Sequence, residues 1–145
     1  MGSRGGTNEQ VTESVNRSRS LEELEDVHWP PPPAGATRLM AEAQALRHKP
    51  VGALGPEDLR LLITQDVGLP YLLPLAVELL RTDPMAEGDL YEGDLLSAVM
   101  TRGRTAWGEV PKAARELRAI LSSPADLPPG LRQEADSFLA VTARL

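Results

Sequence analysis

The segment from Leu69 to Leu80 is apolar on two faces, and it constrains the fold more than any other stretch of the chain. Its apolar residues recur at helical spacing, at positions 69, 72, 73, 76 and 80, and a second apolar set stands at 75 and 79. A helix with two apolar faces is usually covered on both sides by other helices. We therefore expect 69–80 to be the central helix of an all-α domain.

Shorter helices are expected before and after this segment, because helix start signals recur along the chain. The expected helices begin at Ser20, Thr37, Gly55, Gly93, Pro111 and Gly130. Thr101–Gly108 is expected to be a loop. No stretch alternates apolar and polar residues long enough for a convincing strand. The sequence therefore predicts an all-α fold, a single compact domain of six or seven short helices with a disordered N-terminal leader.

Two regions near the N-terminus lack helical periodicity. Residues 1–19 are polar and are expected to be the disordered leader, which leaves 20–145 as the helical domain. Further on, Trp29 leads into Pro30–Pro33, a run that favours polyproline II. We expect a stiff strap along the surface with Trp29 tucked into the core. The alternative is a proline-rich ligand for another domain.

Composition narrows the possible functions. The chain has no cysteines, so disulfides and thiolate chemistry are excluded. Its net charge of −6 argues against direct nucleic-acid binding, which needs a basic footprint. No apolar run suits a signal peptide or a membrane span, so a cytoplasmic location is expected. No nucleophile elbow or phosphate loop is present, and the chain is not expected to be an enzyme.

A dense group of acids follows the central helix. From Glu78 to Asp94 six carboxylates stand against one base, Arg81. The segment 83–94 superficially follows a calcium loop, but Met85 stands where a ligand oxygen is expected and Asp94 is shorter than the usual glutamate. We therefore expect no metal site. A docking surface for a cationic partner and a solvated acidic loop are the remaining interpretations.

Four runs of the sequence carry a family resemblance. Residues 45–50, 56–63, 68–76 and 83–96 read ALRHKP, PEDLRLLI, GLPYLLPLA and DPMAEGDLYEGDLL. In order and spacing, over about Leu21 to Met100, they resemble immunity proteins of bacterial contact-dependent growth inhibition (CDI) systems. The chain is similar in particular to the small helical immunity family whose partners include toxins of the ribonuclease A-like class.

The resemblance implies a non-catalytic inhibitor. We also expect no cofactor and a monomeric free protein. It would bind the C-terminal toxin domain of a cognate effector, expected to be a basic nuclease, and block its active site with an acidic surface. The expected toxin-binding residues are Asp83, Glu87, Asp89, Tyr91, Glu92 and Asp94, with Tyr91 as the aromatic anchor. The alternatives are a helical scaffold or adaptor that uses Pro30–Pro33 and a divergent calcium-binding helix-loop-helix protein.

Overall fold

The computed structural model describes residues 16–122 and 127–145, and in these ranges the protein is helical. In chain order the elements are α2 (Leu21–Glu25), α3 (Arg38–Leu46), the 3-10 turn η1 (Val51–Ala53), α4 (Pro56–Thr64), α5 (Leu69–Thr82), α6 (Asp94–Met100), α7 (Arg104–Gly108), α8 (Pro111–Ser122) and α9 (Pro129–Val141). The described residues contain no strand, only two isolated bridges. The predicted all-α fold is confirmed. Residues 1–15 of the predicted leader lie outside the described ranges.

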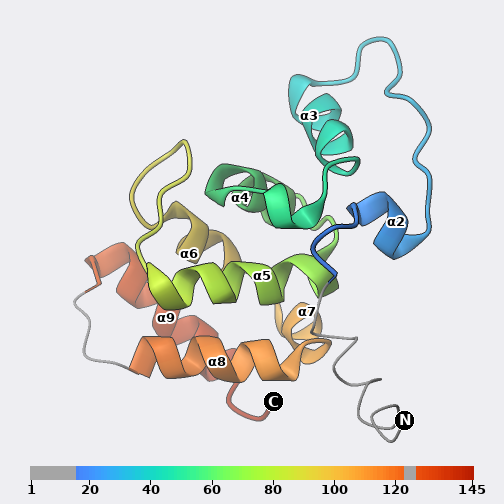
Figure 1. Cartoon of the computed structure of the whole chain (residues 1–145). Coiled ribbons are helices and arrows are strands. Elements are labelled where there is room, and N and C mark those ends of the chain that lie inside the picture. The colour runs from blue at the N-terminus through green and yellow to red at the C-terminus, as the bar shows by residue number, and fades with distance from the viewer. Residues whose placement is uncertain (1–15, 123–126) are drawn as a thin grey trace, which may run out of the picture.

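Helix α5 is the centre of the packing, as its two apolar faces predicted. It packs against α4, α6, α7 and α8, and Figure 1 shows α4, α5 and α8 lying one above another. One face is fully buried, through Leu72, Leu73, Ala76, Val77 and Leu80. The second face is covered less completely, because Leu75 and Leu79 are only partly buried. No helix in the described part of the chain is long and apolar enough to cross a membrane.

The helix starts follow from local chemistry. Ser20, the predicted start of the first helix, forms a capping box with Glu23. Its hydroxyl accepts from the N–H of Glu23 (3.2 Å), and the Glu23 carboxylate accepts from the N–H of Ser20 (2.9 Å). Thr37 caps α3 by accepting from the N–H of Met40 (3.1 Å). These side chains satisfy amide groups that a helix N-terminus otherwise leaves without a partner.

The prediction that residues 101–108 form a loop is wrong, because this segment contains helix α7. Trp107 on α7 is fully buried, donates its indole N–H to the carbonyl of Val99 (3.1 Å), and meets Phe138 edge-on at 5.2 Å between ring centroids. Burial of a large aromatic ring with a satisfied N–H stabilises a short helix that its local sequence does not favour. The packing of the core therefore decides the structure of this segment.

The expectation that Trp29 enters the core is also wrong. Its side chain stays 39% exposed and its ring stacks on the guanidinium of Arg47, 4.3 Å from the ring centroid. Arg47 is the buried member of the pair, and it donates to Glu25 (2.7 Å) and to the carbonyl of Val27 (3.0 Å). The residues from Pro30 to Pro33 follow as an exposed strap between α2 and α3 (Figure 1).

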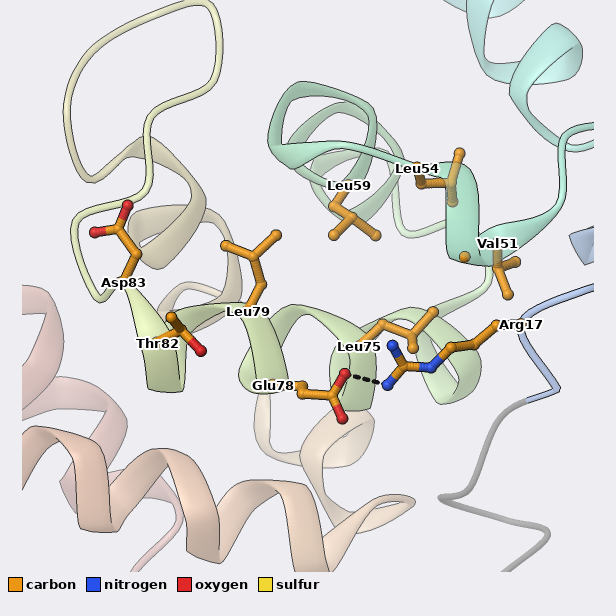
Figure 2. Close-up of a pocket in the computed structure, with 10 residues that line it drawn as sticks. Arg17, Val51, Leu54, Leu59, Leu75, Glu78, Leu79, Thr82 and Asp83 are labelled. Carbon is orange, nitrogen blue, oxygen red and sulfur yellow. Dashed lines mark hydrogen bonds and ion pairs between the residues drawn. The ribbon is translucent and has the colours of Figure 1, made fainter.

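The last residues of the predicted leader lie against the domain. The N–H of Val51 donates to the carbonyl of Arg19, and the N–H of Gly52 donates to the carbonyl of Arg17, each at a distance of 2.9 Å. The Arg17 side chain then reaches α5 and forms an ion pair with Glu78 (Figure 2). Residues 16–19 therefore run alongside η1 and bridge to the central helix.

Candidate functional site

The segment 83–93, here called the acidic loop, connects α5 to α6 and projects from the helical body (Figure 1). The side chains that it exposes belong to Asp83, Glu87, Asp89, Leu90, Tyr91 and Glu92. Five of the six predicted site residues are thus on the surface of one loop. The sixth, Asp94, is buried at the start of α6.

The carboxylate of Asp94 holds the loop from inside. It accepts hydrogen bonds from the backbone N–H groups of Gly88 (2.6 Å), Leu90 (2.9 Å) and Tyr91 (3.3 Å). Because three donors converge on one buried carboxylate, the backbone of 88–91 is tied to the first turn of α6. In this conformation Asp94 shapes the loop and does not present its oxygens to a partner.

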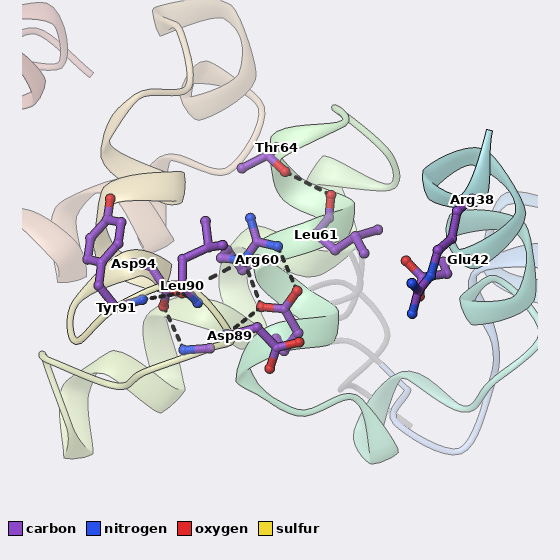
Figure 3. A network of polar contacts seen from close by, with 11 residues as sticks. Arg38, Glu42, Arg60, Leu61, Thr64, Asp89, Leu90, Tyr91 and Asp94 are labelled. Carbon is purple, nitrogen blue, oxygen red and sulfur yellow. Dashed lines mark hydrogen bonds and ion pairs between the residues drawn. The ribbon is translucent and has the colours of Figure 1, made fainter.

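A second anchor comes from α4, beside the loop (Figure 3). Arg60 donates two hydrogen bonds to the Glu57 carboxylate, at 2.7 and 2.6 Å. A Glu57 oxygen also accepts from the N–H of Asp89 (2.8 Å). The Nε of Arg60 lies 3.8 Å from a carboxylate oxygen of Asp94. The two anchors are therefore neighbours, joined by a single guanidinium.

Glycine is required at two positions of the loop. A Cβ at Gly88 would lie 2.6 Å from a Glu57 oxygen and 3.1 Å from an Asp94 oxygen, so a side chain there would collide with both anchors. Gly93, the N-cap of α6, has φ +90, a conformation that side-chain-bearing residues rarely adopt. A bond from the N–H of Gly93 to the carbonyl of Met85 (3.2 Å) closes the base of the loop.

The anchors shift the acidity of the groups involved. Hydrogen bonds from Arg60 lower the pKa of Glu57, and the same contact raises the pKa of Arg60. Burial raises the pKa of Asp94, but the three backbone donors and Arg60 outweigh burial and leave the pKa below its ordinary value. Both carboxylates therefore favour the charged form, in which they hold the loop most firmly.

The outward side of the loop presents exposed carboxylates and exposed apolar side chains together. Within the described residues, the carboxylates of Asp83, Glu87, Asp89 and Glu92 take part in no ion pair. Between them Leu90 is 62% exposed and Tyr91 49% exposed. The Tyr91 ring extends away from α4 (Figure 3). The loop thus combines negative charge with two apolar side chains, a combination suited to a cationic protein surface.

The geometry does not fit the calcium-loop alternative. At Asp94, the last ligand position of such a loop, both oxygens already accept from backbone N–H groups. Across the described residues, no group of three or more acidic or histidine side chains is placed to hold a metal ion. The Asp94 carboxylate is directed at backbone amides, and the acids exposed on the loop form no such group of three.

Sequence reasoning missed Glu57 and Arg60. Glu57 stands in the first turn of α4, where the helix dipole alone would account for a carboxylate. The signal that was available is the spacing of three between the two residues, which places them on one helix face. That spacing indicates the ion pair, but it does not reveal the contact with Asp89, 32 residues further along the chain.

Comparisons with known proteins complete the description of the site. No curated protein matches the chain. The family model of the CDI immunity proteins matches residues 23–117, which is more than half of the sequence. The matched span contains α4, the central helix α5 and the whole acidic loop. We conclude that this chain belongs to the family of CDI immunity proteins.

Proposed function

We propose that this protein neutralises a cognate toxin whose catalytic domain is a basic nuclease of the ribonuclease A-like class. In the cytoplasm, the acidic loop covers the active site of the nuclease and keeps RNA out of it. Membership of the immunity family implies the toxin partner. The exposed carboxylates of the loop support a toxin with a positively charged binding surface.

The observation that supports the proposal is the set of four exposed carboxylates that form no ion pair with any other described residue of the chain. A nuclease must attract phosphates, so its active site is expected to be positively charged. Carboxylates on a projecting loop can take the place of those phosphates. Complementary charge also speeds encounter and selects against partners of the wrong sign.

Anchoring from inside makes the loop suitable for tight binding. Asp94 and Glu57 fix the backbone that carries Asp89, Leu90 and Tyr91. A loop that already has its binding shape loses less conformational entropy when it docks. Asp94 therefore supports binding without touching the toxin.

Leu90 and Tyr91 are proposed as the apolar centre of the interface. A few well-buried side chains usually provide most of the affinity of an interface, and tyrosine is enriched among them. Both side chains are half-exposed or more in the free protein, so docking would remove their apolar surface from water. The neighbouring carboxylates then surround this centre with charge.

The test is a double charge reversal on the loop, Asp89→Lys with Glu92→Lys, in a stopped-flow measurement of association with the cognate toxin domain. We expect the association rate at low salt to fall about tenfold or more. The matched control is Glu109→Lys with Asp136→Lys, which changes the net charge equally at exposed acids on the C-cap of α7 and on α9. An unchanged rate for the loop variant would remove the acidic loop from the interface.

A second measurement tests the nuclease class. RNA cleavage by the toxin domain should stop at one equivalent of the wild-type protein and should continue with the loop variant at concentrations below its weakened dissociation constant. If the toxin domain binds the loop but cleaves no nucleic acid, the loop remains the docking surface and the proposed nuclease class is wrong.

A further inference from the structure

A surface pocket of about 510 Å³ lies between α5, the turn η1 and the start of α4. Figure 2 shows its two walls, with Leu75 and Leu79 of α5 on one side and Val51, Leu54 and Leu59 on the other. This is the second apolar face of α5, which no helix of the described chain covers completely. The walls therefore offer apolar surface to a side chain that enters between them.

Two carboxylates line the pocket. Asp83 of the acidic loop stands at one end, and Glu78, with its side chain 51% exposed, lies on the α5 edge between Thr82 and Leu75 (Figure 2). Asp83 takes part in no ion pair within the described ranges. The pocket thus joins apolar walls to two carboxylates, the environment that suits a long aliphatic side chain with a cationic end.

One such side chain already lies in the pocket. Arg17 lines it and pairs its guanidinium with Glu78 (Figure 2). Its side chain remains 54% exposed, so the pair is in contact with water. Exposed pairs of this kind contribute little to stability, about 0–1 kcal/mol. A cation from another molecule can therefore replace Arg17 at small cost.

The backbone places Arg17 there for a specific reason. The N–H of Gly52 donates to the carbonyl of Arg17 (2.9 Å), and a Cβ at Gly52 would lie 2.8 Å from the Cβ of Arg17 and 3.0 Å from its carbonyl oxygen. The segment 16–19 can approach η1 this closely only because residue 52 has no side chain. Gly52 therefore gives a second way to displace Arg17, by substitution at a residue outside the ion pair.

We propose that this pocket binds an arginine side chain from the surface of the toxin and that Arg17 occupies it in the free protein as an internal substitute. The aliphatic part of the incoming side chain packs between the leucines of α5 and those of η1 and α4. Its guanidinium takes the place of Arg17 at Glu78. The identity of the partner rests on the proposed function, whereas the chemistry of the pocket does not.

The test uses the full chain and a small ligand, Nα-acetyl-arginine-N-methylamide, titrated into the nitrogen-15-labelled protein and followed by NMR. In the Arg17→Ala variant we expect saturable shifts of the amide signals of Val51, Gly52 and Leu79. We expect binding about two- to fivefold tighter than in the wild type, since removing an exposed internal ion pair is worth about that factor. Gly52→Ala should change binding in the same direction.

Two controls separate this proposal from a merely structural Arg17. The citrulline analogue has the same shape without the charge and should not shift these signals, and Glu78→Gln added to Arg17→Ala should abolish binding of the arginine ligand. Equal binding by wild type and variant, or equal binding of both ligands, would overturn the proposal, as would shifts away from the pocket.

The toxin then provides a separate measurement. Arg17→Ala should lower the dissociation constant of the toxin complex by the same factor, and Glu78→Gln should raise it. Because the arginine ligand needs no toxin, its binding to the pocket stands even where the loop charge reversal leaves toxin association unchanged. If the arginine ligand binds the pocket but Arg17→Ala leaves the dissociation constant of the toxin complex unchanged, the occupant of the pocket is not an arginine of the toxin.

Discussion

The carboxylate of Asp94 lies 2.6 Å from the backbone nitrogen of Gly88, six residues earlier in the chain. This hydrogen bond closes the acidic loop into a ring whose polar centre faces inward and whose other carboxylates face outward. The same residue type therefore has two roles within twelve residues of chain. Several measurements can separate the roles.

Asp94→Asn should destabilise the protein by about 2 kcal/mol, because the amide has one acceptor oxygen for three converging N–H donors and leaves at least one of them without a partner. The free energy of unfolding in urea gives the value. Asp89→Asn is the matched control, since the Asp89 side chain is exposed, and it should change this free energy by less than about 0.5 kcal/mol. Equal losses for the two variants would contradict the internal role of Asp94.

Stability should depend on pH through the same anchors. The pKa of Glu57 is lowered by Arg60, and the pKa of Asp94 is lowered because its backbone donors and Arg60 outweigh burial. Their contributions are therefore present above the ordinary carboxyl values, about pH 4, and are lost as the pH falls through the lowered values. We expect the difference in unfolding free energy between wild type and Asp94→Asn to have its full value at about pH 6. At about pH 3 the difference should be smaller. A difference that grows on acidification has the wrong sign for this explanation.

Gly88→Ala tests the space inside the ring. The new methyl group would lie 2.6 Å from a Glu57 oxygen and 3.1 Å from an Asp94 oxygen, so both anchors must move, and we expect a loss of about 1–3 kcal/mol of unfolding free energy. Gly130→Ala makes the same chemical change in the first turn of α9, where nothing lies within 4 Å of the new carbon. It should be neutral or stabilise the protein by up to about 0.5–1 kcal/mol. Similar losses at the two glycines would show that the ring is not tightly filled.

The two tryptophans should differ sharply in their contribution to stability. Trp107→Ala empties a fully buried site beside Phe138 and should cost about 3–5 kcal/mol. Trp29→Ala removes a partly exposed ring that stacks on Arg47 and should cost about 1 kcal/mol. Acrylamide quenching gives an independent check, since the single tryptophan left in Trp107→Phe should be quenched more strongly than the one left in Trp29→Phe. The reverse order would place the wrong ring in the core.

The features that local chemistry controls were predictable. The capping box at Ser20, the cap at Thr37, the start at Gly93 and the central position of 69–80 all depend on residues within a few positions of one another. Hydrogen bonds and apolar spacing over that range can be read from the sequence without a fold. The projecting acidic loop also followed, because it is the segment between two well-defined helices.

The features that depend on tertiary contacts were not predictable. A tryptophan beside four prolines and a tryptophan between glycines look equally suited to a core, and only packing against Val99 and Phe138 selects Trp107. In the same way, the sequence shows six carboxylates near the loop but not that the one at Asp94 turns inward. The three backbone donors of Asp94 lie within six residues of it, but the burial of its carboxylate and its contact with Arg60 of α4 depend on the tertiary fold.

The acidic loop assigns its shape and its outward chemistry to different residues. The residues that fix the shape are Glu57, Arg60, Gly88, Gly93 and Asp94, and those that face outward are Glu87, Asp89, Leu90, Tyr91 and Glu92. Exchanges among exposed side chains cost little folding free energy. An immunity protein built this way can be adapted to an altered toxin by changing what the ring displays, while the ring itself stays folded.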